Sequence, residues 1–162
     1  MNTVLHSHWE SRFDAVPKTI DMIMRLKEIG AKAVAITDHG SVAAIEDAYD
    51  EIEHLVGKKE LEEPIKIIYG EEAYLEMPAA SADEKEIPAH LILMAKDPIG
   101  KHAIDKLVYA ANANPDNRRN YLIITKEMLE NILGVNGFGH GHVIITTACV
   151  SGPIGRTLQA ND

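Results

Sequence analysis

Histidine and carboxylate side chains follow two short apolar segments near the start of the chain. His6 and His8 lie at the carboxyl end of a strand-like segment that begins the chain. Asp38 and His39 come directly after the apolar run Ala33–Thr37. Imidazoles and carboxylates are the usual protein ligands of divalent transition metals. Loops that follow strands are also where α/β folds place their chemistry. Two such pairs, each at the carboxyl end of a short strand-like segment, predict a metal-dependent hydrolytic site.

Other metal-binding residue types lie next to later apolar segments. Asp14 follows His6 by eight residues, and three further candidates adjoin the third, fourth and fifth strand-like runs: Glu72, His90 and Cys149. Clustered metals need carboxylates to bridge them and to offset their charge, and Asp14 and Glu72 are the candidates for that role. Such a centre would make hydroxide available near neutral pH and polarise a phosphoryl oxygen.

The composition is that of a small globular domain. The chain has 162 residues, of which 46% are hydrophobic, so it can bury a core and is not wholly disordered. Its formal net charge of −9 argues against a general nucleic-acid-binding surface but not against a nucleotide at a metal site. The single cysteine cannot form an internal disulfide, and neither a signal peptide nor a membrane-length apolar run is found, so we expect a cytoplasmic protein.

Strand and helix patterns alternate along the chain. Short apolar runs predict strands at Thr3–His6, Ala33–Thr37, Ile65–Tyr69, Leu91–Ala95 and Val143–Thr147. Helical spacing predicts helices at Pro17–Ile29, at Ile99–Ala113, at Lys126–Leu133 and in a segment capped by Ser41 with Ile45, Ala48, Tyr49 and Ile52 on one face. This order favours an α/β fold of parallel βα units whose strand ends converge on one face.

Five segments in this order resemble the PHP (polymerase and histidinol phosphatase) domain family. They are VLHSHWESRFDAV, AVAITDHGSV, IIYGEEAYLE, HLILMAKDPIG and IITTACVSG, which together run from about Thr3 to about Leu158. The similarity is to the branch found at the N-terminus of bacterial DNA polymerase III alpha subunits. The segment AKDPIGKHAIDKLVYAA and the position of Cys149 favour that branch over stand-alone phosphatases.

The resemblance implies a fold and a role for each candidate residue. It implies a single domain over residues 1–162 with a distorted (βα)7-type PHP barrel. It implies two or three divalent ions (Zn, Mn or Fe) held by His6, His8, Asp14, His39, Glu72, His90 and Cys149. Asp14, Asp38 and His39 are the candidate catalytic residues, and Asp38 is expected to orient an imidazole through a hydrogen bond. Glu71 is expected to be solvated, because a strand alternates its faces.

The implied activity is metal-dependent phosphoester hydrolysis of an exonuclease type, in a parent protein that is a DNA-directed DNA polymerase. The substrate would be a DNA 3′ end or another phosphate ester, and other replication proteins would be partners. A stand-alone phosphatase of small phosphoesters and a catalytically silent metal-binding module remain as alternatives. Cys149 is either a ligand or a buried small hydrophobe. Trp9 either walls the site, stacks a base or packs in the core.

The chain departs from the family at its C-terminal end. The family's site ends with an Asp-x-His pair on a late strand, and no such pair follows Cys149 before Asp162. We therefore expect a barrel that is incomplete at the C-terminus, in either a truncated piece of a longer protein or a naturally short relative. Open strand edges would then be covered by a second copy of the chain.

Overall fold

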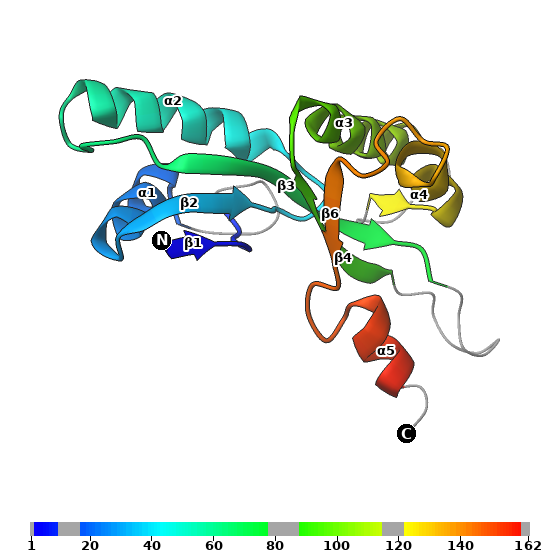
Figure 1. Ribbon diagram of the computed structural model, residues 1–162. Helices are drawn as coiled ribbons and strands as arrows, with labels where there is room; N and C mark the ends of the chain where they lie inside the picture. Colours follow the sequence, from blue (N-terminus) through cyan, green and yellow to red (C-terminus); the bar gives the residue numbers. More distant parts are fainter. Residues whose placement is uncertain (1, 10–16, 78–87, 115–121, 160–162) are drawn as a thin grey trace. The chain divides into compact units, whose positions relative to one another are not determined.

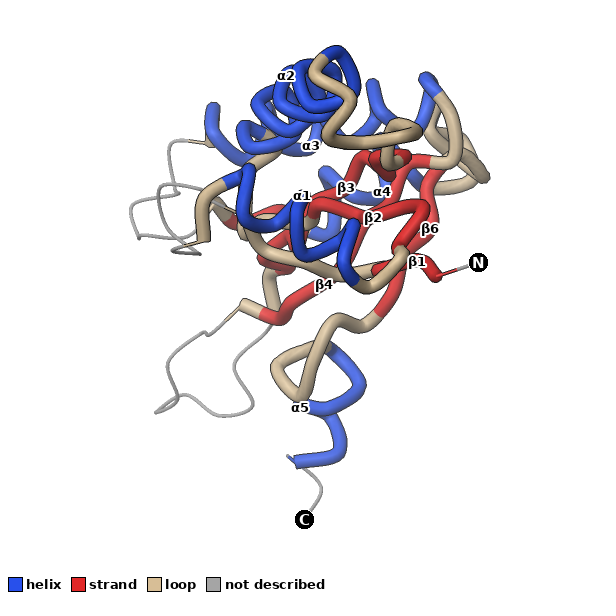
Figure 2. The backbone as a smooth tube through the Cα atoms, turned by 90° about the vertical axis from the view of Figure 1, so that its left-hand side faces the viewer, coloured by secondary structure: helices blue, strands red, loops and turns tan. Residues whose placement is uncertain are grey.

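The computed structural model describes residues 2–9, 17–77, 88–114 and 122–159, which contain both helices and strands (Figures 1 and 2). The elements are β1 (Asn2–Val4), α1 (Thr19–Glu28), β2 (Ala31–Ile36), α2 (Ala43–Gly57), β3 (Lys66–Leu75), β4 (Ala89–Ala95), α3 (Pro98–Ala113), β5 (Ile123–Ile124), α4 (Lys126–Leu133), β6 (Val143–Thr146) and α5 (Pro153–Gln159). The predicted α/β class is confirmed.

Two compact units follow one another along the chain, Met1–Glu71 and Glu72–Asp162. Their boundary falls within β3, so the first part of this strand belongs to one unit and the remainder to the other. The single domain expected over residues 1–162 stays a prediction.

Three parallel strands form the sheet of the first unit (Figure 1). Val34 of β2 is in register with Val4 of β1 on one side and with Ile67 of β3 on the other. Five of the six residues of β2 are buried, which is the pattern of a strand that is covered on both faces. The parallel βα arrangement predicted for this part of the chain is confirmed, and it brings the carboxyl ends of β1 and β2 to the same edge of the sheet.

Helices α1 and α2 pack against each other and supply much of the first unit's core. The predicted face of α2 is buried at Ile45, Ala48 and Ile52, whereas Tyr49 is 50% exposed, so its assignment to the core face was wrong. Tyr49 follows Ala48 by one residue, and adjacent helical residues point about 100° apart. Helix α1 begins at Thr19, so Pro17 does not occupy its first turn.

The second unit contains strands of both directions. The end of β3 pairs in parallel with β5, and β4 pairs antiparallel with β6, with Leu93 opposite Ile145. The prediction of parallel strands throughout was wrong for β6. Helix α4 precedes β6, and the turns at residues 134–141 bring the chain to the carboxyl end of β4. Strand β6 starts there and runs along β4 in the opposite direction.

Helix α3 packs on β4 and is fixed at its N-terminus by Asp97. The carboxylate of Asp97 accepts a hydrogen bond from the Gly100 N–H at 3.0 Å and contacts His142 Nδ1 at 2.6 Å. The hydrogen bond with His142, followed by that from Gly100, lowers the pKa of Asp97. These contacts tie the glycine-rich segment before β6 to the start of α3, at the carboxyl end of β4.

Strand β6 follows β4 as the last strand in the order of the sheet, and two of its apolar side chains are exposed. Ile144 and Ile145 are 48% and 45% exposed. The second copy expected to cover open strand edges stays a prediction. Among the described residues, no helix has the length and apolar character needed to cross a membrane.

Candidate metal centre

The segment containing His6 and His8 is attached to the carboxyl end of β2. The Thr37 N–H donates to the Ser7 carbonyl oxygen at 3.0 Å, and the Ser7 hydroxyl donates to the Ala35 carbonyl oxygen at 2.7 Å. The chain therefore continues alongside β2 for a few residues beyond the end of β1. This extension places the two histidines of the H-x-H motif beside the Thr37-Asp38-His39 motif, as the sequence predicted.

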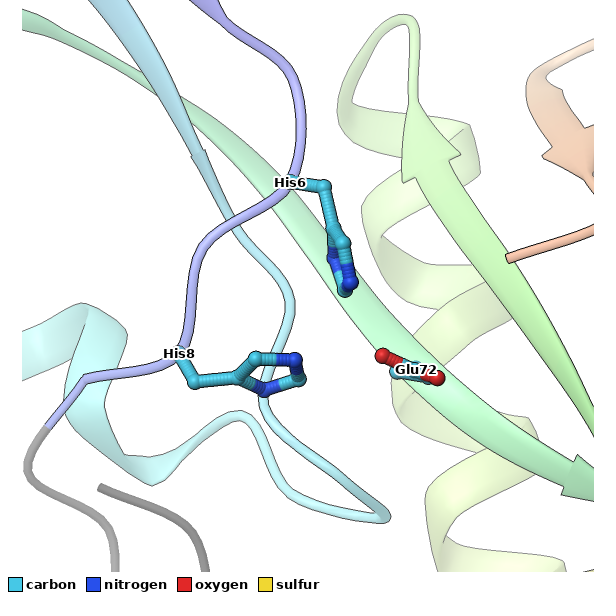
Figure 3. Close-up of side chains that lie close together, drawn as sticks. All are labelled: His6, His8 and Glu72. Atoms are coloured by element: carbon cyan, nitrogen blue, oxygen red, sulfur yellow. The ribbon is translucent and has the colours of Figure 1, made fainter. Parts of the chain in front are cut away.

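Three imidazole rings of the first unit lie close together. The ring centroids of His6 and His8 are 4.7 Å apart in an edge-on arrangement, and those of His8 and His39 are 4.8 Å apart and stacked. Figure 3 shows His6 and His8 projecting from the loop that follows β1. Neutral imidazole is a ligand for zinc, iron and other transition metals, so this group has the donor chemistry of a divalent metal site.

Asp38 is fully buried beside these rings. Its Oδ1 accepts a hydrogen bond from the Trp9 backbone N–H at 2.7 Å and lies 4.0 Å from His8 Nδ1. A separation of 4.0 Å is beyond hydrogen-bond range, so Asp38 places its negative charge near His8 without a direct bond between these two atoms. Its role in orienting an imidazole stays a prediction.

Trp9 settles one alternative left open by the sequence. Its side chain is fully buried in the core of the first unit, and its indole N–H donates to the Ser7 hydroxyl at 2.8 Å. A buried indole has no free face on which a nucleotide base could stack. Trp9 therefore packs in the core and braces the loop between His6 and His8.

Glu71 and Glu72 lie inside β3, not after its end as the sequence predicted. Their exposed fractions are 1% and 2%, so the expectation that Glu71 is solvated was wrong. Residues 70–73 are all buried, and the alternation of a strand therefore does not separate a solvent face here. Burial raises the pKa of Glu71 to about 8, and its Oε2 has no hydrogen-bond partner among the described residues.

In the second unit, Glu72 of β3 contacts His90 of β4. Glu72 Oε1 lies 2.7 Å from His90 Nδ1, and the rings of Tyr74 and His90 meet edge to face at 5.1 Å. Figure 3 shows Glu72 on its strand. A carboxylate and an imidazole held together in this way are compatible with binding a divalent metal.

Cys149 is an exposed thiol that follows β6, so its interpretation as a buried small hydrophobe was wrong. Its sulfur accepts a hydrogen bond from the Ser151 N–H at 3.3 Å, and the Ser151 carbonyl oxygen accepts one from the His90 N–H at 3.1 Å. Because β6 runs antiparallel to β4, the segment after β6 returns to the start of β4, where His90 lies. Cys149 and His90 therefore belong to the same end of this strand pair.

Asp14 lies outside the described residues. The Thr37 hydroxyl contacts His6 and Ser7, and the Ser7 hydroxyl donates to Ala35 of β2. The sequence did not predict these contacts, although Thr37 directly precedes the Asp38-His39 pair. The one signal in the sequence is that Thr37 adjoins the predicted site residues Asp38 and His39.

Known proteins resemble this chain over nearly its whole length. It is 29% identical over 163 residues to the DNA polymerase III subunit alpha of Helicobacter pylori strain J99, a match covering 99% of the chain and 12% of that protein. It is 31% identical over 160 residues to the same subunit of Campylobacter jejuni, covering 97% of the chain and 12% of that protein. The chain thus spans about an eighth of these relatives.

A shorter match is to the PolC-type DNA polymerase III of Caldanaerobacter subterraneus, 42% identical over 72 residues that cover 44% of the chain and 5% of that protein. A crystal structure of a protein described as a metal-dependent phosphoesterase from Bifidobacterium adolescentis aligns with a TM-score of 0.39 and 13% identity, covering 79% of this chain and 49% of the other. The family model of the PHP domain matches residues 4–162. The chain therefore belongs to the PHP domain family.

Proposed function

We propose that this chain is a metal-dependent phosphoesterase domain that hydrolyses phosphodiester bonds, with a DNA 3′ end as its substrate. The observation that carries the proposal is the group of three imidazoles, His6, His8 and His39, at the carboxyl ends of β1 and β2. These rings come from the H-x-H and T-D-H motifs of a chain that belongs to the PHP family.

The proposed ligands are the seven residues that the family resemblance implies, of which Asp14 lies outside the described residues. They are His6, His8, Asp14, His39, Glu72, His90 and Cys149. Imidazole, carboxylate and thiolate donors together favour Zn, Mn or Fe over the purely oxygen-bound Mg and Ca, and seven donors are enough for two or three ions. When bound, such ions lower the pKa of a coordinated water and polarise a phosphoryl oxygen.

The chain's own residues would orient these donors. The Trp9 N–H holds Asp38, and Asp38 Oδ1 lies 4.0 Å from His8 Nδ1, so we propose that this carboxylate helps to orient the His8 ring. In the second unit, the Glu72 carboxylate holds His90 by Nδ1 and leaves Nε2 as the ring's other donor atom. Asp14, Asp38 and His39 are the groups that we propose to move protons during hydrolysis.

The relatives support a proposed cellular role. Because curated relatives are DNA polymerase III alpha subunits, we propose a role in DNA replication, in the cytoplasm, with other replication proteins as partners. The DNA-directed polymerase activity of such a protein would belong to the parts of the relatives that this chain does not match.

Chelation tests the proposal. Protein treated with a chelator should lose hydrolysis of a 3′-labelled single-stranded oligonucleotide, and Zn, Mn or Fe should restore it, because the metal generates the nucleophile. A small phosphomonoester assayed in parallel separates this activity from that of a stand-alone phosphatase. Hydrolysis that resists chelation would contradict the proposal. So would stoichiometric metal without hydrolysis, which would leave a structural metal-binding module.

A further inference from the structure

The hydroxyl of Thr37 is the centre of a buried hydrogen-bond network beneath the H-x-H motif. Thr37 is fully buried, and its Oγ1 lies 2.7 Å from His6 Nδ1. The same oxygen is 3.3 Å from both the backbone nitrogen and the carbonyl oxygen of Ser7. The Thr37 hydroxyl therefore contacts the predicted ligand His6 and both backbone polar groups of Ser7, the residue that follows His6.

One assignment of donors and acceptors turns all three contacts of the Thr37 hydroxyl into hydrogen bonds at once. The Ser7 N–H can only donate, so the Thr37 oxygen accepts from it. The single proton of the hydroxyl can be given to the Ser7 carbonyl oxygen, which can only accept. In that arrangement the short contact to His6 is satisfied when Nδ1 of the ring carries the proton and donates it to Thr37.

The loop around this hydroxyl is fixed independently of it. The Ser7 side chain donates to the Ala35 carbonyl oxygen and accepts the indole N–H of the buried Trp9. The Thr37 N–H also binds the Ser7 carbonyl oxygen. Removal of the hydroxyl alone would therefore leave the backbone of the loop in place, while the His6 ring would lose the partner of its Nδ1.

We propose that Thr37 is a positioning residue that selects the Nδ1–H tautomer of His6 and so presents Nε2 as the metal-binding atom. The ligand role of His6 rests on the proposed function, whereas tautomer selection rests on the hydrogen bonds alone. A metal-binding histidine commonly donates its other ring N–H to a protein oxygen, and that bond sets both the tautomer and the ring orientation.

Nitrogen-15 NMR of the histidine rings tests the tautomer directly in the metal-free protein. The His6 signals are assigned by comparison with a His6→Asn variant, at a pH high enough to keep the rings neutral. The wild type and Thr37→Ser should show the Nδ1–H form of His6, because both retain the hydroxyl. Thr37→Val, which has nearly the same shape, should shift His6 toward the Nε2–H form. Circular dichroism verifies that the variants are folded.

Zinc titration of the same proteins gives the functional consequence. Loss of the orienting bond in Thr37→Val should weaken zinc binding by about 10–100-fold, and Thr37→Ser should bind as the wild type does. Two results would overturn the inference. One is an Nε2–H tautomer of His6 in the wild type, a measurement that does not depend on the folding of any variant. The other is an unchanged tautomer in folded Thr37→Val. If the tautomers behave as expected but the wild type binds no metal, the proposed function fails and tautomer selection stands.

Discussion

Replacement of His8 by Ala is expected to reduce metal-dependent phosphodiester hydrolysis by at least ~100-fold, since loss of groups that merely orient a ligand already costs 10–100-fold. The His8 ring is next to both the His6 ring and the His39 ring, with centroids 4.7 and 4.8 Å away, so its loss removes a donor that neighbours the other two. The measurement is initial rate on a 3′-labelled oligonucleotide at saturating metal.

The fold should tolerate this change. The His8 side chain is 27% exposed and lies outside the helices and strands, and circular dichroism verifies that the truncated variant is folded. His54→Ala is a matched control, because His54 is an exposed residue near the end of α2 and should leave the rate unchanged. Unchanged hydrolysis by a folded His8→Ala protein would refute the ligand assignment.

Glu71→Gln is expected to stabilise the metal-free protein at pH 7 to 8. Burial raises the pKa of Glu71 from 4.5 to about 8, so between these values the folded state binds a proton that the unfolded state has released. Stability from this group is fully present below pH 4.5 and is lost as the pH rises through about 8. At about 1.36 kcal/mol per pKa unit, the difference at neutral pH is on the order of 3 kcal/mol.

Urea unfolding between pH 5 and pH 8 measures this effect. The free energy of unfolding of the wild type should fall across this range, and that of Glu71→Gln should fall much less, because an amide does not titrate. Glu53→Gln, at an exposed position of α2, serves as the control. Equal slopes for the wild type and Glu71→Gln would show that Glu71 is ionised in the folded protein at neutral pH.

The sequence predicted the features that depend on local pattern. Helical spacing identified α2 and α3 because their buried faces repeat every three to four residues, and the apolar run of β2 identified a strand covered on both sides. The meeting of His6, His8 and His39 was also predictable, because parallel β1 and β2 end at the same sheet edge.

Features that depend on tertiary packing were not predictable in this way. The third apolar run predicted a strand that ends at Tyr69, yet β3 continues to Leu75, because pairing with β5 at Tyr74 extends it. The burial of Glu71 follows from that continuation. Neither the two-residue strand β5 nor the short helix α5 has enough residues for a period to be recognised.

The antiparallel direction of β6 was missed for the same reason, because it depends on tertiary pairing. Its apolar sequence fits a parallel or an antiparallel strand equally well, and pairing with β4 decides between them. The antiparallel pairing brings the segment of Cys149 to His90. In the sequence, His90 directly precedes a predicted strand, and nothing in the local pattern indicates that Cys149 lies near it. The network of Thr37 and Ser7 was missed because hydroxyl side chains carry no periodic signal.

Metal content measured by mass spectrometry, on protein purified without a histidine tag, tests the central claim most directly. The wild type should hold two or more Zn, Mn or Fe ions per chain, Glu72→Ala should be depleted, and the exposed control Glu53→Ala should match the wild type, because Glu72 is a proposed bridging ligand. Absence of stoichiometric metal from the wild type, or equal content in Glu72→Ala, would contradict the account.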